Sequence, residues 1–414
     1  MVFEKKYDNG LRLVVKQMDG LMSVTMGVLV GTGAAVETDA EDGISHFIEH
    51  MQFKGTKKRN AFELSDSFDR LGAQVNAFTS KEITCYYSKC TSDHTAECFE
   101  LLADLFLNST YPEEEMVREK GVVCEEISMN EDTPEDLCLD ILAAAHYGKQ
   151  NYGRNILGTA NNVKGFSVAD IMRYKKARYC PENIVISFAG GIDKQTAQAL
   201  VESYFGVLEK GAFEKRALTV SLQNQSLYKT KSIEQAHIAL CYPSVARGDR
   251  LEDAVSAVNA VLGGSMSARL FQEVREKRGL AYSVYSYVSP YEHCGSQVIY
   301  AGVNPKQREE AYAAINEVIA DIKKNGVTKD EFLRSREQMK ASLFFSNENS
   351  NSQMLLYGKY MLQCNQVFDF EKKLDTINQM TYEQSFEAIE NMFDESKKSA
   401  AIVGNVKKPL VIGK

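Results

Sequence analysis

The sequence predicts an α+β protein built from two similar halves, and two observations indicate this fold class. Residues 112–118 are echoed by residues 328–334, an offset of 216 positions, and an apolar-rich helical segment precedes each copy. Short segments that suit paired strands are followed by blocks of helical periodicity, which is typical of α+β layers. We therefore predict two domains, residues 1–215 and 216–414, divided within a polar stretch at about residues 210–225.

The strands of the first half can be placed from turn chemistry. Asn9-Gly10 lies between two apolar runs and predicts a hairpin turn. Further on, residues 74–78 and 83–87 read as half-exposed strands joined by a turn at residues 80–82. A strand at the edge of a sheet has backbone donors and acceptors that a peptide can pair with, so the first of these strands is a candidate for holding an extended substrate.

A short helix predicted between the Asn9-Gly10 hairpin and the strand at residues 74–78 contains two histidines four residues apart. His46 and His50 fall on one face of a helix and can reach one metal ion, while Glu49 lies about 60° around the axis from His46. Zinc hydrolases need three protein ligands, an open fourth position and a carboxylate that accepts a proton from the metal-bound water, so we assign Glu49 as the general base. An apolar stripe would bury the helix, and Gly55 would end it: Ile44, Phe47, Ile48 and Met51.

The third ligand must come from another segment. Pro112 and the acidic residues after it are typical of the first turn of a helix, which continues through Glu126. Glu119 and Glu126 differ by only about 20° around this helix, whereas Glu125 points about 120° away from Glu119. We therefore predict Glu126 as the ligand and Glu119 as a supporting carboxylate on the same face.

Only the first half has these ligands. At the offset of 216 positions, Glu126 corresponds to Ser342, and residues 253–262, where the second half should have its zinc helix, contain no histidine. Plainer interpretations of the individual residues stay open: His46 and His50 could be core residues bonded to carbonyl oxygens, and single acids in so acidic a stretch are often solvated.

The complete motif set consists of His46-x-x-Glu49-His50, Met51-x-Phe53-Lys54-Gly55-Thr56, Asn76-Ala77-Phe78-Thr79-x-x-Glu82-x-Thr84-x-Tyr86, and Glu119 six positions before Glu125-Glu126. It resembles the insulinase/pitrilysin family of zinc endopeptidases, and most of all its branch of short subunits, which includes the mitochondrial processing peptidase and its bacterial relatives. The resemblance covers essentially the whole chain. It implies two homologous α/β sandwiches, each an antiparallel-rich sheet covered by helices, and zinc bound by His46, His50 and Glu126. Polar Gln52 is unusual within its apolar run.

The resemblance also implies where substrate binds. It places Asn76, Ala77 and Phe78 on the substrate edge. In the second half, residues 265–278 read as a helix that ends at Gly279 and is followed by a strand, and Arg275 and Tyr282 match a family pair that contacts the scissile region. Two such chains, as a homodimer or a heterodimer with a related subunit, would close into a chamber that admits unfolded peptides.

Composition excludes several other function classes. The net charge of -8 without a basic cluster disfavours nucleic acid, and no stretch is long and apolar enough to span a membrane. The first residues lack a secretory or transit pattern, so we expect no targeting segment. Nine cysteines without C-x-x-C pairs argue against a disulfide framework and favour the reducing cytoplasm.

The function predicted from these residues is hydrolysis of extended or unfolded peptides by a zinc metalloendopeptidase. Two other classes stay open. One is a non-catalytic scaffold or partner subunit of the same fold, and the other is a module that binds peptides by strand addition without cleaving them. Zinc content measured together with turnover of a peptide would separate the three.

Overall fold

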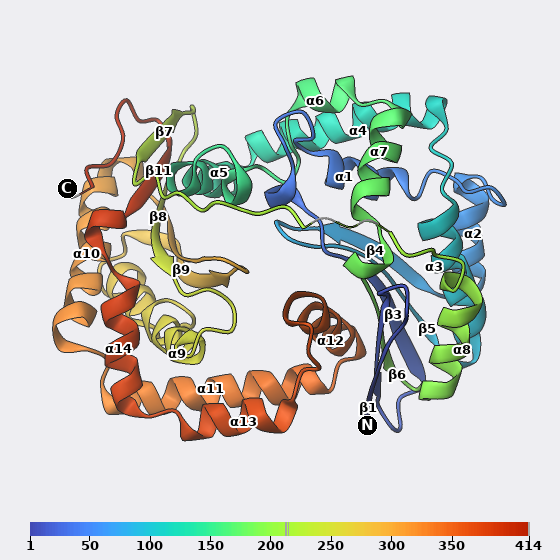
Figure 1. The fold of residues 1–414 in the computed structure, drawn as a ribbon. Coiled ribbons are helices and arrows are strands. Elements are labelled where there is room, and N and C mark those ends of the chain that lie inside the picture. Colours follow the sequence, from blue (N-terminus) through green and yellow to red (C-terminus); the bar gives the residue numbers. More distant parts are fainter. Residues whose placement is uncertain (212, 214, 413–414) are drawn as a thin grey trace. The chain divides into compact units, whose positions relative to one another are not determined.

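The computed structural model describes residues 1–211, 213 and 215–412, which form two compact units (Figure 1). Residues 212 and 214 of the predicted boundary stretch and residues 413–414 lie outside the described residues. The predicted division at residues 215/216 stays a prediction, and each unit includes a segment from the other half of the chain. Unit 1 comprises Met1–Ile127, Asn155–Ala217 and Phe344–Asp369; unit 2 comprises Ser128–Arg154, Leu218–Leu343 and Phe370–Lys414.

Unit 1 is built on a six-stranded sheet with the order β1-β2-β6-β3-β5-β4. Its pairs are antiparallel except for β2 with β6, which are parallel. The predicted hairpin at Asn9-Gly10 is confirmed, because it joins β1 to β2. The strands are β1 (Val2–Lys6), β2 (Arg12–Gln17), β3 (Ser23–Val30), β4 (Gln74–Thr79), β5 (Thr84–Thr91) and β6 (Ile184–Gly190).

The central strand β3 is buried on both faces of this sheet. Its even-numbered residues, Val24 to Val30, belong to the large core that includes helices α1, α3, α7 and α8. Its odd-numbered residues meet α12, which comes from the other half of the chain: Thr25 bonds Ser350 at 2.9 Å, and a Cβ at Gly27 would lie 2.5 Å from the sulfur of Met354. Side chains alternate between the faces of a strand, so one strand serves both layers.

Helices cover both faces of the first sheet. Besides the helices named above, unit 1 contains α2, α4 and α6. The residues of α4 after Ile127 belong to unit 2. The helices of unit 1 are α1 (Ile44–Met51), α2 (Ala61–Arg70), α3 (Thr95–Asn108), α4 (Glu113–Asp132), α6 (Ala160–Gly165), α7 (Val168–Arg178), α8 (Lys194–Phe205) and α12 (Ser350–Cys364).

Unit 2 repeats this architecture with a five-stranded sheet of order β7-β11-β8-β10-β9. These strands correspond in order to β2, β6, β3, β5 and β4, and the parallel pair recurs as β7 with β11. The predicted α+β fold with internal duplication is therefore confirmed. The strands are β7 (Ser226–Thr230), β8 (Ala236–Ser244), β9 (Ala281–Pro290), β10 (Gly295–Val303) and β11 (Ser399–Gly404).

The helices of unit 2 also form two layers. Helix α5 packs on β8 and β11 through Cys138 and Leu142, whereas α9, α10 and α14 contribute to the core of the opposite face. The helices are α5 (Pro134–Tyr147), α9 (Glu252–Leu262), α10 (Arg308–Asn325), α11 (Lys329–Asn347), α13 (Phe370–Gln379) and α14 (Tyr382–Met392). Short 3₁₀ turns lie at Ala34–Val36, Ser92–His94, Asn151–Gly153, Pro181–Asn183, Pro305–Gln307 and Glu395–Lys397.

Two predicted helix boundaries were wrong. Helix α1 ends at Met51 rather than at Gly55, because the N–H groups of Phe53 and Lys54 bond carbonyl oxygens three residues back and tighten the chain into a turn. The helix predicted from residue 265 begins near residue 269 and widens into a π-helical segment, Phe271–Lys277. Its predicted end is confirmed, because Gly279 has a left-handed φ of 61° and bonds Arg275.

Two expectations from composition can be compared with the described part of the chain. Helices there are either too short or too polar to cross a membrane. All nine cysteines occur as thiols in that part, as expected for a chain without a disulfide framework.

Candidate metal centre

Helix α1 is held at both its start and its apolar side. The buried carboxylate of Glu37 accepts the backbone N–H groups of Gly43 at 2.7 Å and Ser45 at 2.8 Å, which satisfies donors that the first turn leaves unpaired. Gly43 has a φ of 91°, a left-handed conformation that glycine adopts readily. The predicted apolar stripe is buried, and the two histidines project from its margin.

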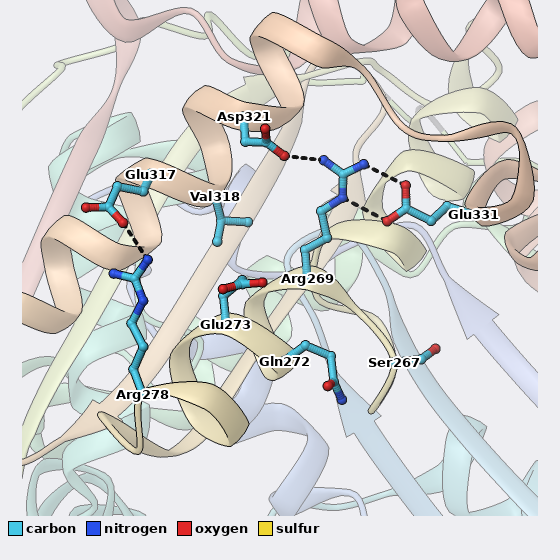
Figure 2. A pocket seen from close by; sticks show the side chains of 9 residues that line it. All are labelled: Ser267, Arg269, Gln272, Glu273, Arg278, Glu317, Val318, Asp321 and Glu331. Carbon is cyan, nitrogen blue, oxygen red and sulfur yellow. Dashed lines mark hydrogen bonds and ion pairs between the residues drawn. The ribbon is translucent and has the colours of Figure 1, made fainter.

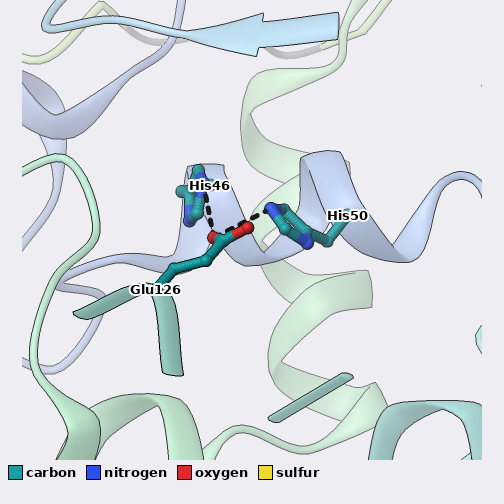
Figure 3. A group of neighbouring side chains, drawn as sticks. All are labelled: His46, His50 and Glu126. Carbon is teal, nitrogen blue, oxygen red and sulfur yellow. Dashed lines mark ion pairs between the residues drawn. The ribbon is translucent and has the colours of Figure 1, made fainter. Parts of the chain in front are cut away.

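His46, His50 and Glu126 converge from two helices on one point (Figure 3). One nitrogen or oxygen atom from each lies within 4.8 Å of the other two. Glu126 Oε2 of α4 lies 3.4 Å from His50 Nε2 and 3.7 Å from His46 Nε2. Among the residues that the structure describes, this is the group of three or more potential ligands that could hold a metal ion, and it is the predicted set.

The two separations from Glu126 suit a tetrahedral zinc ion. Zinc bonds of about 2.0–2.1 Å to nitrogen and oxygen place two ligand atoms about 3.3–3.4 Å apart at the tetrahedral angle. The two measured separations are within a few tenths of an ångström of that value. Two imidazoles and one carboxylate are also a donor set that catalytic zinc sites use, with the fourth position open.

Glu119 holds His50 in the orientation that a metal ligand needs. His50 Nδ1 lies 2.8 Å from Glu119 Oε1, so this nitrogen carries the proton, and in the neutral ring Nε2 has the lone pair that a metal ion needs. Glu119 is in turn held by Lys54, whose ammonium lies 2.6 Å from its other oxygen. The sequence predicted Glu119 as a supporting carboxylate but missed Lys54, although Lys54 belongs to the motif itself.

The charges around the two histidines differ. Burial and the neighbouring ring of His50 lower the pKa of His46 to about 4, so His46 is neutral at neutral pH. Burial alone would lower the pKa of His50 too, but the hydrogen bond to Glu119 and the nearby carboxylates raise it above its usual value. For Glu119, burial opposes ionisation, but the bonds from His50 and Lys54 outweigh it and lower the pKa. The carboxylates around His50 therefore favour positive charge on its ring, whereas the buried ring of His46 stays neutral.

Glu49 lies beside the cluster and is hydrogen-bonded to β4, the strand that the sequence predicts to hold substrate. Thr79 Oγ1, at the end of β4, donates to Glu49 Oε2 at 2.5 Å. Burial raises the pKa of Glu49 above its usual value, and the bond from Thr79 partly opposes this. A carboxylate with a raised pKa is a better proton acceptor, as general-base catalysis requires. Thr79 was not predicted as a site residue, although it directly follows the Asn76-Ala77-Phe78 motif.

Strand β4 is at the edge of its sheet, as strand addition would need. Ala77 packs with the core that contains α1, whereas Phe78 packs on the opposite face against Tyr87 and beneath the Lys359 ammonium, 5.1 Å from its ring centre. Asn76 is exposed, and its side chain accepts the N–H of Ala77. The Phe78 side chain therefore lies on the opposite face from α1 and is not brought together with the metal cluster.

Arg275 and Tyr282 lie together in unit 2. The Arg275 guanidinium carbon is 5.1 Å from the ring centre of Tyr282 and 4.7 Å from that of Phe271. Tyr282, near the start of edge strand β9, is 76% exposed, so its hydroxyl is open to a ligand. The two residues predicted as a pair are therefore in contact, with the guanidinium group of Arg275 stacked on the ring of Tyr282.

A hollow of about 540 Å³ in unit 2 is lined in part by Gln272 and Glu273 of the π-helical segment (Figure 2). Its arginines are paired with its own carboxylates: Arg269 with Asp321 and Glu331, and Arg278 with Glu317. Because these charges already have partners, the hollow is a weaker candidate site than the metal cluster.

Similarity to known proteins shows the family of this chain. The profile described as Insulinase (Peptidase family M16) matches residues 13–160, and that of the Peptidase M16 inactive domain matches residues 165–339. A protein named as an uncharacterized zinc protease, YmxG of Bacillus subtilis, is 41% identical over 401 residues, covering 96% of this chain and 98% of its own length. The chain belongs to the insulinase family of peptidases. An uncharacterized zinc protease of Streptomyces coelicolor is 35% identical over 90% of this insulinase-family chain and 83% of its own length.

Solved structures show the same fold. The peptidase M16 inactive domain from Pseudomonas fluorescens has a TM-score of 0.91, with 22% identity over 100% of this chain and 99% of its own. A protease from Helicobacter pylori has a TM-score of 0.88, with 22% identity over 98% and 99% of the two chains. Within this insulinase-family chain, the match of its second half to an inactive domain agrees with the location of the metal cluster in the first half.

Replacing Glu119 by Gln should weaken zinc binding by about 10- to 100-fold, the usual effect of removing a carboxylate that supports a ligating histidine. The amide introduced at this position would be neutral and would no longer stabilise the orientation of the His50 ring through a charged hydrogen bond. Zinc affinity is measured by competition with a chelator. The exposed Glu125→Gln change is the matched control, and equal affinities of the two variants would contradict the role of Glu119.

Proposed function

We propose that this chain is a zinc-dependent endopeptidase that hydrolyses extended or unfolded peptides. The convergence of His46, His50 and Glu126 at separations suited to one zinc ion, with Glu49 beside them, is the observation that carries the proposal. The relatives named as zinc proteases support the same metal.

The residues of the site have distinct tasks in this proposal. When bound, zinc would make the attacking water more acidic and polarise the scissile carbonyl. Glu49 accepts the proton from that water and delivers it to the leaving amine. Thr79 holds the Glu49 carboxylate in place, and Glu119 orients His50. None of these tasks requires another cofactor.

Strand β4 gives the proposed enzyme its preference for extended substrates. Its outer edge can pair with a peptide backbone, and Thr79 at its end is bonded to the proposed base. A peptide added to this edge is thereby placed in fixed register beside Glu49. Such binding recognises the backbone more than the sequence, so a folded protein would be a poor substrate.

A library of quenched peptides, incubated with the zinc-loaded protein and analysed by mass spectrometry, tests the proposal. An endopeptidase produces internal cuts in several unrelated sequences. A peptide-binding module would bind the peptides and leave them intact, and a scaffold would do neither. Internal cuts that persist after zinc is removed would contradict the zinc mechanism.

We further propose that two chains, identical or related, close into a chamber in which Arg275 and Tyr282 of one serve the zinc site of the other. Tyr282 would donate to the oxygen that becomes negatively charged in the transition state. Glu49→Gln and Tyr282→Phe proteins, each nearly inactive alone, should then regain activity on mixing, because one of the two mixed sites has both an intact base and an intact tyrosine.

Subunit exchange in that experiment is followed by an affinity tag on one variant. Recovery of activity requires exchange and a site shared between chains. If the subunits exchange, Tyr282→Phe alone is impaired and no activity returns, then the pair acts within its own chain and the shared-site proposal fails.

A further inference from the structure

The polar residue in the apolar run after the histidines has a specific set of partners. Gln52 is fully buried and directly follows α1, two residues beyond His50. Its amide nitrogen donates to the Phe106 carbonyl at 3.2 Å, and its amide oxygen accepts from the Tyr111 hydroxyl at 2.8 Å. A buried amide is tolerated only when its donors and acceptors are satisfied, so these contacts explain why a polar side chain occupies this position.

Lys175 of α7 completes the group. Its ammonium donates to the Tyr111 hydroxyl at 2.6 Å, to the Phe106 carbonyl at 3.2 Å and to Gln52 Oε1 at 3.3 Å. It also lies 5.2 Å from the ring centre of Tyr179 and 5.3 Å from that of Tyr111. In the described part of the chain, the partners of this ammonium are neutral groups and aromatic rings, and burial lowers the pKa of Lys175 to about 7.

Tyr111 is the residue through which this group reaches α4. It directly precedes Pro112 and has a left-handed φ of 52°, a conformation that costs free energy for a residue with a side chain. Its side chain is 3% exposed, and its hydroxyl is bonded to both Gln52 and Lys175. These bonds hold the Tyr111 side chain in place two residues before α4 begins.

We propose that Gln52, Tyr111 and Lys175 form a positioning cluster that sets the start of α4 against the end of α1. The cluster thereby brings Glu119 and Glu126 to the two histidines. Gln52 is part of the chain that carries the histidines, and Tyr111 begins the segment that carries both glutamates. Because a helix moves as a rigid element, a change of direction at Tyr111 alters where both carboxylates lie. This inference rests on the zinc binding in the proposed function, but not on peptide cleavage.

Tyr111→Phe, which removes a single hydroxyl, provides the first test. Its zinc affinity, measured by chelator competition, should be weaker by about tenfold or more, as for other groups that orient ligands. Tyr300→Phe is the matched control, because Tyr300 is also buried and its hydroxyl lies 2.7 Å from His237 Nδ1 in unit 2, where it contacts neither α1 nor α4. The control should lower the melting temperature similarly and leave zinc affinity unchanged.

Substitutions at Gln52 separate positioning from general stability. Gln52→Leu removes all three amide contacts and should weaken zinc binding. Gln52→Glu keeps an acceptor for Tyr111 and Lys175 and should retain most of the affinity. In a Lys175→Met background, Tyr111→Phe should weaken zinc binding by less than in the native background, because the effects of substitutions within one hydrogen-bond network are not additive.

The positioning role is overturned if Tyr111→Phe and Tyr300→Phe lower the melting temperature alike and both retain native zinc affinity. It is also overturned if Gln52→Glu binds zinc as weakly as Gln52→Leu. A native protein that binds zinc but cleaves no peptide would contradict the proposed function, while the comparison of zinc affinities would still test the cluster.

Discussion

Replacing Glu49 by Gln is expected to abolish nearly all peptide cleavage while zinc stays bound. The change removes the proposed proton acceptor but none of the three atoms that converge on the metal position. General-base catalysis contributes about 10²- to 10⁴-fold to rate, so kcat/KM should fall by that factor, or roughly 3–5 kcal/mol of transition-state stabilisation. Cleavage of a quenched peptide and zinc content are measured on the same sample.

The zinc content distinguishes the two roles that a carboxylate could have at this position. Thr79 can donate its hydrogen bond to the amide oxygen of the substituted side chain as it does to Glu49 Oε2, so the local geometry should be kept. If the Glu49→Gln protein loses its zinc, Glu49 is a ligand and the assignment of the base is wrong. If it keeps both zinc and native turnover, another group accepts the proton.

Replacing Glu126 by Gln should remove most of the bound zinc, and activity with it. Glu126 supplies the anionic ligand and lies within 3.4 Å and 3.7 Å of the two histidine nitrogens. Removing Glu119, which only supports a ligand, is expected to weaken zinc binding by about 10- to 100-fold. Removing one of the three protein ligands should weaken it further. Zinc affinity is measured by chelator competition for both variants.

Glu125→Gln is the control for this change, because Glu125 is adjacent in sequence, carries the same charge and is exposed on another face of α4. It should keep native zinc affinity and native turnover. A Glu125→Gln protein that loses zinc while Glu126→Gln keeps it would exchange the two assignments.

The metal cluster could be predicted from sequence because helical geometry relates its members. The four-residue spacing of His46 and His50 and the seven-residue spacing of Glu119 and Glu126 each put two side chains on one helix face. The apolar stripe of α1 then determined which side of that helix is buried. The spacing alone does not bring the two helices together; that contact was expected because the metal needs a third ligand, and the resemblance to a known family implied the same set.

Contacts between segments far apart in sequence could not be predicted in the same way. Lys175 lies 123 positions from Gln52, and a lysine in a helix is typical of a solvated face, so nothing in the sequence indicated their hydrogen bond. The sequence likewise did not indicate that residues 128–154 belong to unit 2 and residues 344–369 to unit 1. Nothing in the sequence indicated that α12 covers the sheet of unit 1.

Titration of zinc into the metal-free protein, with peptide cleavage followed at each step, tests the central claim most directly. If His46, His50 and Glu126 hold one catalytic zinc ion, cleavage should be absent at the start, rise with added zinc and saturate at one zinc per chain. Cleavage by the metal-free protein, or a fully loaded protein that cleaves no peptide, would contradict the claim.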